Sequence, residues 1–313
     1  MTMTAKLSTG SLAAALGVFL LATSTMAANP AKPAQLTFAS PKDAVDALVQ
    51  AAEKYDVTAF QEILGPDGID LVVTQDRVQD RNQAAAWLQK VHEKLTVVIN
   101  PDDPNVATVN VGLEDWPMPI PVVKEGNGWR FDSKAGREEI FLRRIGENEL
   151  TAIAVCRRYV EAQNEYATVK HDGALVNQYA QHIISTQGKH DGLAWHDADG
   201  TWGGPMGEEI AGAIAEGYRE RYSPYHGYYF KILKGQGPSA PLGEMDFVVK
   251  GLMIGGFALV AAPADYEKTG VKTFIVGYDG VVYEKDMGPA TFEAFQEMER
   301  YDPDESWTPV KAP

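Results

Sequence analysis

The stretch that decides the fold is Val122-Val-Lys-Glu-Gly-Asn-Gly-Trp-Arg-Phe-Asp132, in which two short apolar runs flank a glycine-rich turn. Such a turn between runs of β-branched and aromatic residues predicts an antiparallel hairpin. Just upstream, residues 96–99 are β-branched and residues 107–111 alternate apolar with polar side chains. The sequence therefore predicts a small antiparallel meander in this region.

Three helices are expected before this meander. Ser40 suits an N-cap and Pro41 suits the first helical position, and apolar residues then recur at helical spacing as far as Ala52. Shorter helical patterns cover residues 57–64 and 81–95. Helices followed by a meander predict an α+β lobe over residues 36–133.

A second lobe is expected over residues 146–313, after a linker at residues 134–145. It begins with a long helix over residues 147–169, a stretch that contains neither Pro nor Gly and carries an apolar stripe. Further helical patterns cover residues 174–184 and 208–220, and a polar loop separates them.

The rest of the second lobe has the pattern of an antiparallel β-meander. Residues 228–233 and 256–262 are apolar and strand-like, and the Asp279-Gly280 turn joins two more such runs into a hairpin. A final helix is expected at residues 290–300. The predicted fold class is therefore α+β in two lobes, the first with a curved antiparallel sheet and the second with a long helix and a meander.

The N-terminus has the pattern of a secretory signal peptide. Lys6 precedes an apolar run at residues 12–21, and small residues follow up to Ala27. We expect cleavage after Ala27, a disordered leader at residues 28–35, and a periplasmic or secreted protein. No later run is long enough to span a membrane, so no transmembrane segment is expected once the signal is removed.

The charge and the cysteine content restrict the possible partners. The 313 residues carry a formal net charge of −15, which disfavours nucleic acids and anionic lipid surfaces because their phosphates would be repelled. Cys156 is the single cysteine, so no disulfide can form within the chain. Its helical surroundings favour a buried small apolar residue over a reactive thiol. No cofactor is predicted.

Two polar or aromatic clusters are candidates for chemistry. Imidazoles and carboxylates close in sequence suit a transition metal or an acid–base pair, although a solvated polar loop has the same composition. The members of this first cluster are His190, Asp191, His196, Asp197 and Asp199. Aromatic rings beside a histidine suit a pocket or a glycan platform, although rings that fill a core have the same pattern. The members of this second cluster are Tyr225, His226, Tyr228 and Tyr229.

The chain as a whole resembles the bacterial exported family known as domain of unknown function 2950. The motifs that carry the resemblance are Glu114-Asp-Trp-Pro-Met-Pro-Ile-Pro121, Gly136-Arg-Glu-Glu-Ile140, Arg144-Ile-Gly-Glu-Asn-Glu-Leu150, Tyr225-His-Gly-Tyr-Tyr-Phe230 and Asp279-Gly-Val-Val-Tyr-Glu-Lys-Asp286. The resemblance covers nearly all of residues 36–310. It implies an envelope or secreted protein and implies no activity.

Each lobe also has a fainter resemblance at the level of the fold. Residues 44–52, Val106-Ala-Thr-Val-Asn-Val111 and the hairpin stretch resemble the nuclear transport factor 2-like fold, in which helices pack on a curved sheet. Asn148-Glu-Leu-Thr-Ala-Ile153, with Arg157 and Tyr166, is similar to the start of a pseudopilin globular domain. Neither resemblance implies a function, because one fold serves many functions.

The leading hypothesis is a non-enzymatic envelope protein that binds a partner protein or assists an assembly. The sequence lacks the nucleophile elbow, the zinc-binding helix motif and the glycine-rich phosphate loops of common enzymes. One alternative is a metal-dependent hydrolase of envelope material, with His190, Asp191, His196 and Asp197 as metal ligands. Another is a small-ligand carrier with its pocket in the first lobe.

Overall fold

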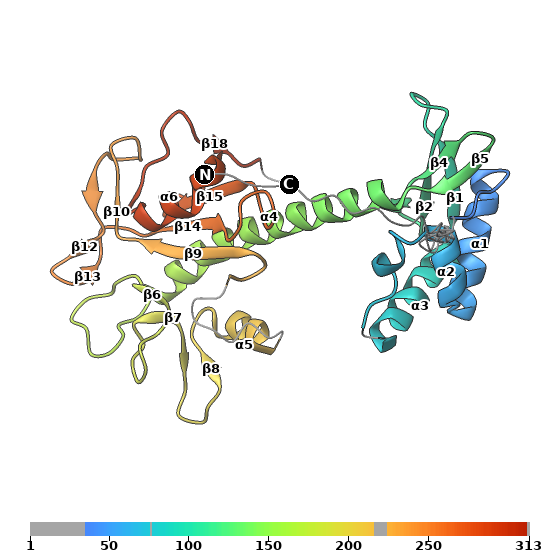
Figure 1. Ribbon diagram of the computed structural model, residues 1–313. Coiled ribbons are helices and arrows are strands. Elements are labelled where there is room, and N and C mark those ends of the chain that lie inside the picture. Colours follow the sequence, from blue (N-terminus) through green and yellow to red (C-terminus); the bar gives the residue numbers. More distant parts are fainter. Residues whose placement is uncertain (1–34, 76, 216–223, 312–313) are drawn as a thin grey trace, which may run out of the picture.

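The computed structural model describes residues 35–75, 77–215 and 224–311. The expected signal peptide and all but the last residue of the expected leader lie outside these ranges. The fold is α+β, as predicted. Two groups of elements lie at opposite ends of the long helix α4 (Ser133–Tyr166), and each has its own hydrophobic cluster (Figure 1). We call these groups the N-terminal lobe and the C-terminal lobe.

Three helices open the N-terminal lobe: α1 (Pro41–Lys54), α2 (Val57–Leu64) and α3 (Arg77–Glu93). The predicted cap of α1 is confirmed, because the Ser40 hydroxyl accepts the backbone N–H of Asp43 at 3.1 Å and Pro41 follows it. Asp56 caps α2 in the same way. A short 3-10 helix, η1 (Ile69–Leu71), lies between α2 and α3.

An antiparallel sheet follows these helices: β1 (Leu95–Ile99), β2 (Val106–Val111), β3 (Trp116–Pro117), β4 (Val122–Glu125) and β5 (Gly128–Phe131). The strand order is β1-β2-β4-β5, with β3 paired to β2. The predicted hairpin is confirmed, since Val122 pairs with Phe131 and Glu125 with Gly128. The helices cover one face of the sheet, where alternate residues of β2 are buried (Figure 1).

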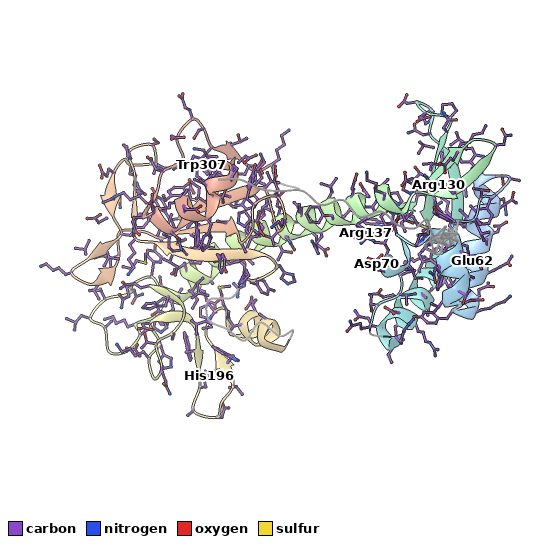
Figure 2. The ribbon with its side chains drawn as sticks, viewed as in Figure 1. Glu62, Asp70, Arg130, Arg137, His196 and Trp307 are labelled. Carbon is purple, nitrogen blue, oxygen red and sulfur yellow. The ribbon has the colours of Figure 1, made fainter. Side chains whose placement is uncertain are left out.

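A single helix, α4, replaces the linker expected at residues 134–145. It begins at Ser133, rather than at residue 147, because Asp132 caps it by accepting the N–H of Ala135 at 3.2 Å. Its glycines do not break it, since one helical glycine costs only about 1 kcal/mol relative to alanine. Arg137 on α4 pairs with Asp70 at 2.6 Å, which attaches the first turns of the helix to the N-terminal lobe (Figure 2).

The second half of α4 packs on the main sheet of the C-terminal lobe. The strands of this sheet are β9 (Tyr228–Leu233), β14 (Ala258–Pro263), β15 (Lys272–Gly277), β16 (Val282–Asp286) and β18 (Thr308–Pro309). They pair antiparallel in the order β18-β16-β15-β14-β9, so the predicted meander and its hairpin between β15 and β16 are confirmed. Helix α6 (Thr291–Glu297), preceded by η2 (Gly288–Ala290), packs against β14.

The helix expected at residues 174–184 is wrong, and so is the unbroken polar loop after it. This region contains β6 (His182–Ile184), β7 (Gly192–His196) and β8 (Trp202–Gly203). The buried amide of Gln163 explains the change, because it donates to Ala180 O at 2.9 Å and accepts the Ala180 N–H at 2.8 Å. These two bonds occupy backbone groups that a helix would need for itself.

The remaining elements are short. Helix α5 (Gly207–Ala215) begins where a helix was expected at residues 208–220, and the last part of that expected helix lies outside the described residues. The short strands are β10 (Gly235–Gln236), β11 (Met245–Asp246), β12 (Val248–Val249), β13 (Leu252–Met253) and β17 (Arg300–Tyr301). Among the described residues, no helix has the length and apolar character needed to cross a membrane.

Candidate functional site

One exposed loop, residues 237–243, joins β10 to β11 and ends in a strained turn. The N–H of Gly243 donates to Ala240 O at 3.0 Å, which closes a turn with Pro241 and Leu242 at its centre. Leu242 has φ +70°, a region that favours glycine. It occupies the third position of a type II turn, where glycine or asparagine is usual. Its side chain is 86% exposed, so this leucine is presented to solvent.

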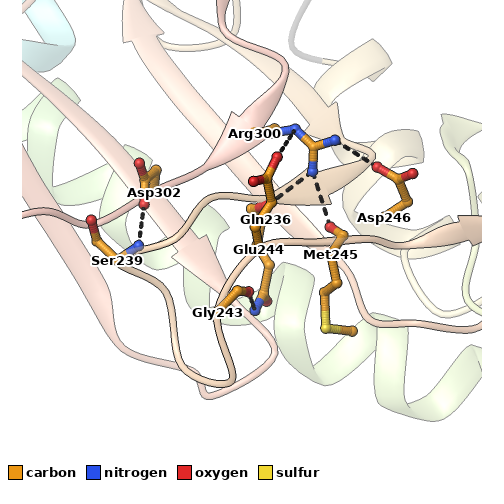
Figure 3. Close-up of polar contacts among 8 residues, drawn as sticks. All are labelled: Gln236, Ser239, Gly243, Glu244, Met245, Asp246, Arg300 and Asp302. Carbon is orange, nitrogen blue, oxygen red and sulfur yellow. Dashed lines mark hydrogen bonds and ion pairs between the residues drawn. The ribbon is translucent and has the colours of Figure 1, made fainter.

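The fully buried side chain of Gln236 holds the loop from below. Its amide nitrogen donates to Pro241 O at 2.5 Å. It also donates to Gly243 O at 2.6 Å (Figure 3). Both partners are carbonyl oxygens, so only the NH₂ end of the amide can face them. The amide oxygen of Gln236 is buried and has no hydrogen-bond partner within the described part of the chain. The carbonyl groups of Pro241 and Gly243, on either side of Leu242, are therefore fixed in place, while the amide oxygen of Gln236 is left without a hydrogen bond.

Arg300 clamps the base of the loop. Its guanidinium donates to Gln236 O at 3.0 Å and to Met245 O at 3.1 Å, and so it joins the strands that enter and leave the loop (Figure 3). It also pairs with Asp246 at 2.7 Å and lies 3.8 Å from a carboxylate oxygen of Glu244. Carbonyl and carboxylate acceptors use most of its fixed donor set, so the arginine acts here as a structural clamp.

Two further side chains, which directly follow strands β15 and β17, fix the loop. The carboxylate of Asp302 accepts the N–H of Ser239 at 2.8 Å. The hydroxyl of Tyr278 donates to Pro241 O at 3.2 Å. The loop is therefore held by contacts on both sides of Leu242, while the leucine side chain itself points away from them. Because these contacts already exist, a partner that binds this leucine would not have to order the loop.

The surface around the loop is acidic. The carboxylates on or beside it belong to Glu244, Asp246, Asp302, Asp304 and Glu305. The hydroxyl and the N–H of Ser306 hydrogen bond to Asp304 and hold the pKa of that carboxyl below its usual value. Asp304 is therefore charged at neutral pH, and Arg300 is the cation that lies among these acidic side chains.

The structure separates the predicted histidine and aspartate cluster into local pairs. The His190 ring lies 3.3 Å from the carboxylate of Asp172, which also accepts the His190 N–H at 2.8 Å. Asp191 accepts the N–H of Thr186 at 2.7 Å. Burial acts to raise the pKa of Asp191, but the hydrogen bonds from Thr186 outweigh it, and the pKa is lowered.

The other three members lie on and after β7. The His196 ring, at the lower end of the C-terminal lobe (Figure 2), lies against Trp202 with centroids 3.9 Å apart and the ring planes tilted by 37°. Asp197 accepts the indole N–H of Trp195 at 3.2 Å, and Asp199 accepts the N–H of Thr201 at 3.0 Å. Within the described ranges, no three His, Cys, Asp or Glu side chains are grouped to hold a metal ion.

The predicted aromatic cluster is divided between two faces of β9. Tyr228 is fully buried in the core and its hydroxyl donates to Lys272 O at 2.8 Å. Tyr229, the next residue along the strand, points to the other face, where its ring lies 5.4 Å from that of Phe292. Tyr225 and His226 remain together, with ring centroids 4.4 Å apart. The four residues therefore do not form one platform.

Comparison with known proteins places the chain in a family without assigning it an activity. The family model described as "Protein of unknown function (DUF2950)" matches residues 35–310, which is most of the chain. The chain belongs to this family. Neither the curated proteins nor the solved structures contain a match. The family resemblance seen in the sequence is thus confirmed, and the pseudopilin similarity stays a prediction.

In this member of the DUF2950 family, the candidate site was missed at the level of the sequence. Ala240-Pro-Leu-Gly243 has proline at the position typical of a turn, but leucine stands where a type II turn favours glycine. The sequence pattern therefore predicted neither the type of the turn nor the exposure of Leu242 at its tip. The residues that hold the loop, Gln236, Tyr278, Arg300 and Asp302, lie on three different strands or strand ends and share no motif.

Proposed function

We propose that this protein is an exported, non-enzymatic binding protein of the cell envelope, which docks a partner protein on the tip of its 237–243 loop. The observation that carries the proposal is Leu242, a strained and exposed leucine on a loop that is held by hydrogen bonds from the buried Gln236 and from Tyr278 and Asp302. The export itself rests on the signal pattern of residues 1–27.

The energetics of the loop favour a role in binding over a role in folding. A non-glycine residue in the left-handed region costs about 1–2 kcal/mol, and burying an acceptor such as the Gln236 amide oxygen without a partner costs about 1–3 kcal/mol. The Leu242 side chain is exposed, so it contributes no hydrophobic stabilisation to the fold. Local costs of this kind are characteristic of functional sites, where the surrounding structure maintains them.

The expected partner has an apolar pocket of leucine size. Because the loop is preorganised, binding would not lose free energy to loop ordering, and a single well-placed side chain can then contribute a large share of the affinity. The acidic residues around the loop predict a basic rim on the partner and an association rate that falls with added salt.

The proposal can be tested by photo-cross-linking in the native host. A photoreactive amino acid at position 242 is expected to give a discrete ultraviolet-dependent adduct with one envelope protein. Position 175 is the matched control, because Leu175 is 87% exposed and lacks a positive φ. Leu242→Gly should abolish co-purification of the adducted protein. Equal adduct patterns at both positions, or unchanged co-purification with Leu242→Gly, would refute the proposal.

The hydrolase alternative has less support from the geometry. Of its four candidate ligands, Asp191 and Asp197 use carboxylate oxygens for neighbouring N–H groups, and the His196 ring lies against Trp202. Metal analysis of protein purified without chelators tests this alternative directly. A stoichiometric metal that is lost with His190→Ala would favour the hydrolase over the binding protein.

A further inference from the structure

The sheet of the N-terminal lobe has one closed edge and one open edge. On the β5 side, Phe38 exchanges backbone hydrogen bonds with Trp129, with distances of 2.7 and 2.8 Å, and so closes that edge. On the opposite side, β1 (Leu95–Ile99) pairs with β2, and no other described strand pairs with it. The outer edge of β1 therefore offers backbone groups to a further strand.

The register of β1 identifies the groups that point outward. Asn100 N–H donates to Val106 O, and Gly112 N–H donates to Lys94 O, so the even-numbered residues of this segment bond toward β2. In an antiparallel pair these directions alternate along the strand. The N–H and C=O groups of Leu95, Val97 and Ile99 consequently point away from the sheet.

Within the described residues, strand β1 lacks the charge, the proline and the bulge that commonly protect a sheet edge. Natural edges are blocked by lysine, proline, a bulge or a covering segment. Strand β1 reads Leu95-Thr-Val-Val-Ile99, without a charge or a proline, and its five-residue ladder with β2 runs without a bulge. Val98 is 47% exposed and Ile99 is 43% exposed, so the end of the strand is accessible.

We propose that β1 pairs antiparallel with β1 of a second copy of this chain, which joins the two N-terminal sheets into one. Centred on Val97, this pairing sets Val97 opposite Val97 of the partner subunit. It also sets Leu95 opposite Ile99 of the partner subunit, and the same contact repeats across the two-fold axis. Each of these pairs exchanges its N–H and C=O groups, so every outward group of β1 receives a partner.

The side chains favour a second copy over another extended chain. Antiparallel self-pairing sets each residue opposite its mirror position, so a strand pairs well with itself when the two positions match in character. Here leucine faces isoleucine, threonine faces valine and valine faces valine, and no charged side chain within the strand meets its like. This interface lies in the N-terminal lobe and is independent of the proposal for Leu242, which lies in the C-terminal lobe.

The test measures the mass in solution and the exchange of individual amides, with the full mature chain. Sedimentation velocity is expected to show a dimer that dissociates on dilution. Hydrogen exchange should show the amides of Leu95, Val97 and Ile99 protected in the dimer and exposed on dilution. Val97→Pro removes the central outward N–H and should raise the dimer dissociation constant by about tenfold or more.

A second variant keeps the result interpretable if the proline variant fails to fold. Val98→Lys places a charge on the outer face of the edge strand and should also weaken the dimer. Thr108→Lys is the matched control, because Thr108 pairs with Val98 on the same face but lies on the inner strand β2. A chain that stays monomeric with freely exchanging β1 amides would overturn the proposal. So would a dimer that Val98→Lys and Thr108→Lys leave equally intact, or β1 amides that only a different protein protects.

Discussion

The loop at residues 237–243 and the turn at residues 197–201 are both exposed, and they are built in opposite ways. In the turn, Asp199 accepts the N–H and the hydroxyl of Thr201, so the polar groups are used within the turn itself. In the loop, Gln236, Tyr278 and Asp302 reach in from the body of the lobe. The difference shows that titratable side chains can be fully occupied by hydrogen bonds to their own turn. The exposed position of a leucine, by contrast, can depend on hydrogen bonds from residues far away in the sequence.

This comparison predicts which side chains of the C-terminal lobe can be replaced without a loss of stability. Removing a group that holds the 237–243 loop should disturb buried structure, whereas removing a carboxylate from the turn should disturb a few exposed hydrogen bonds.

Gln236→Ala should lower the free energy of unfolding by about 2–4 kcal/mol, because it leaves a cavity and removes the donors to two loop carbonyls. Urea unfolding measures the change. Gln181→Ala is the matched control, since Gln181 is only half-buried and makes one comparable, solvent-exposed hydrogen bond, to Gly251 O at 2.8 Å. Its effect should stay within about 1 kcal/mol. Equal effects from the two variants would contradict the view that the loop is held from within the core.

Cys156 provides a pH-dependent measure of the core beneath both regions. Burial raises the pKa of its thiol to about 12, from an ordinary value of 9.0. Well below pH 9 the thiol is protonated in both states and contributes no slope. As the pH rises through 9, the unfolded chain loses the proton and the folded chain keeps it, so the free energy of unfolding falls by about 1 kcal/mol between pH 9 and 10.

Urea titrations of the wild type and of Cys156→Ala between pH 9 and 10 test this contribution. Buried tyrosines, whose ordinary pKa is 10.0, add the same pH dependence to both proteins, so the difference between the two isolates the thiol. Cys156→Ala should flatten the dependence relative to the wild type. The same thiol should resist alkylation in the folded chain. A destabilised variant should become reactive only when unfolding of the C-terminal lobe exposes Cys156. A wild-type slope that survives Cys156→Ala would assign the pH dependence to another group.

Leu242→Gly should raise the free energy of unfolding by up to about 1 kcal/mol, although it removes a large side chain. Relief of the left-handed strain exceeds the added chain entropy of glycine, and the exposed leucine loses no burial. Leu175→Gly is the matched control with the opposite expected sign, because Leu175 lacks a positive φ and only the entropic term applies. Thermal and urea unfolding of the two variants should therefore shift in opposite directions.

The sequence predicted the parts of the fold whose causes are local. The hairpins at β4–β5 and β15–β16 and the cap of α1 depend on residues within a few positions of each other, so their patterns were visible. The helix expected at residues 174–184 failed because Gln163, on α4, takes the backbone of Ala180. A local pattern cannot reveal a partner that is brought close only by the tertiary fold.

The candidate site shows the same limit more strongly. Arg300 reaches Gln236 across 64 positions of sequence, and Asp302 reaches Ser239 across 63. The sequence offered instead His190, Asp191 and their neighbours, which are close along the chain but bind separate local groups. Proximity in the sequence therefore revealed a segment rich in histidine and aspartate. Which side chains meet in space is determined by the tertiary fold.

The smallest effect is expected at the turn. Asp199→Ala should leave the urea midpoint unchanged within the error of the titration, because its hydrogen bonds to Thr201 are exposed and water replaces them. Its pKa is lowered mainly by the Thr201 hydroxyl, a local interaction without a buried partner. Added zinc or a chelator should likewise leave the melting temperature unchanged, both in the wild type and in the variant. A zinc-dependent rise that Asp199→Ala removes would show that the turn binds a metal, and it would reverse the comparison between the two regions.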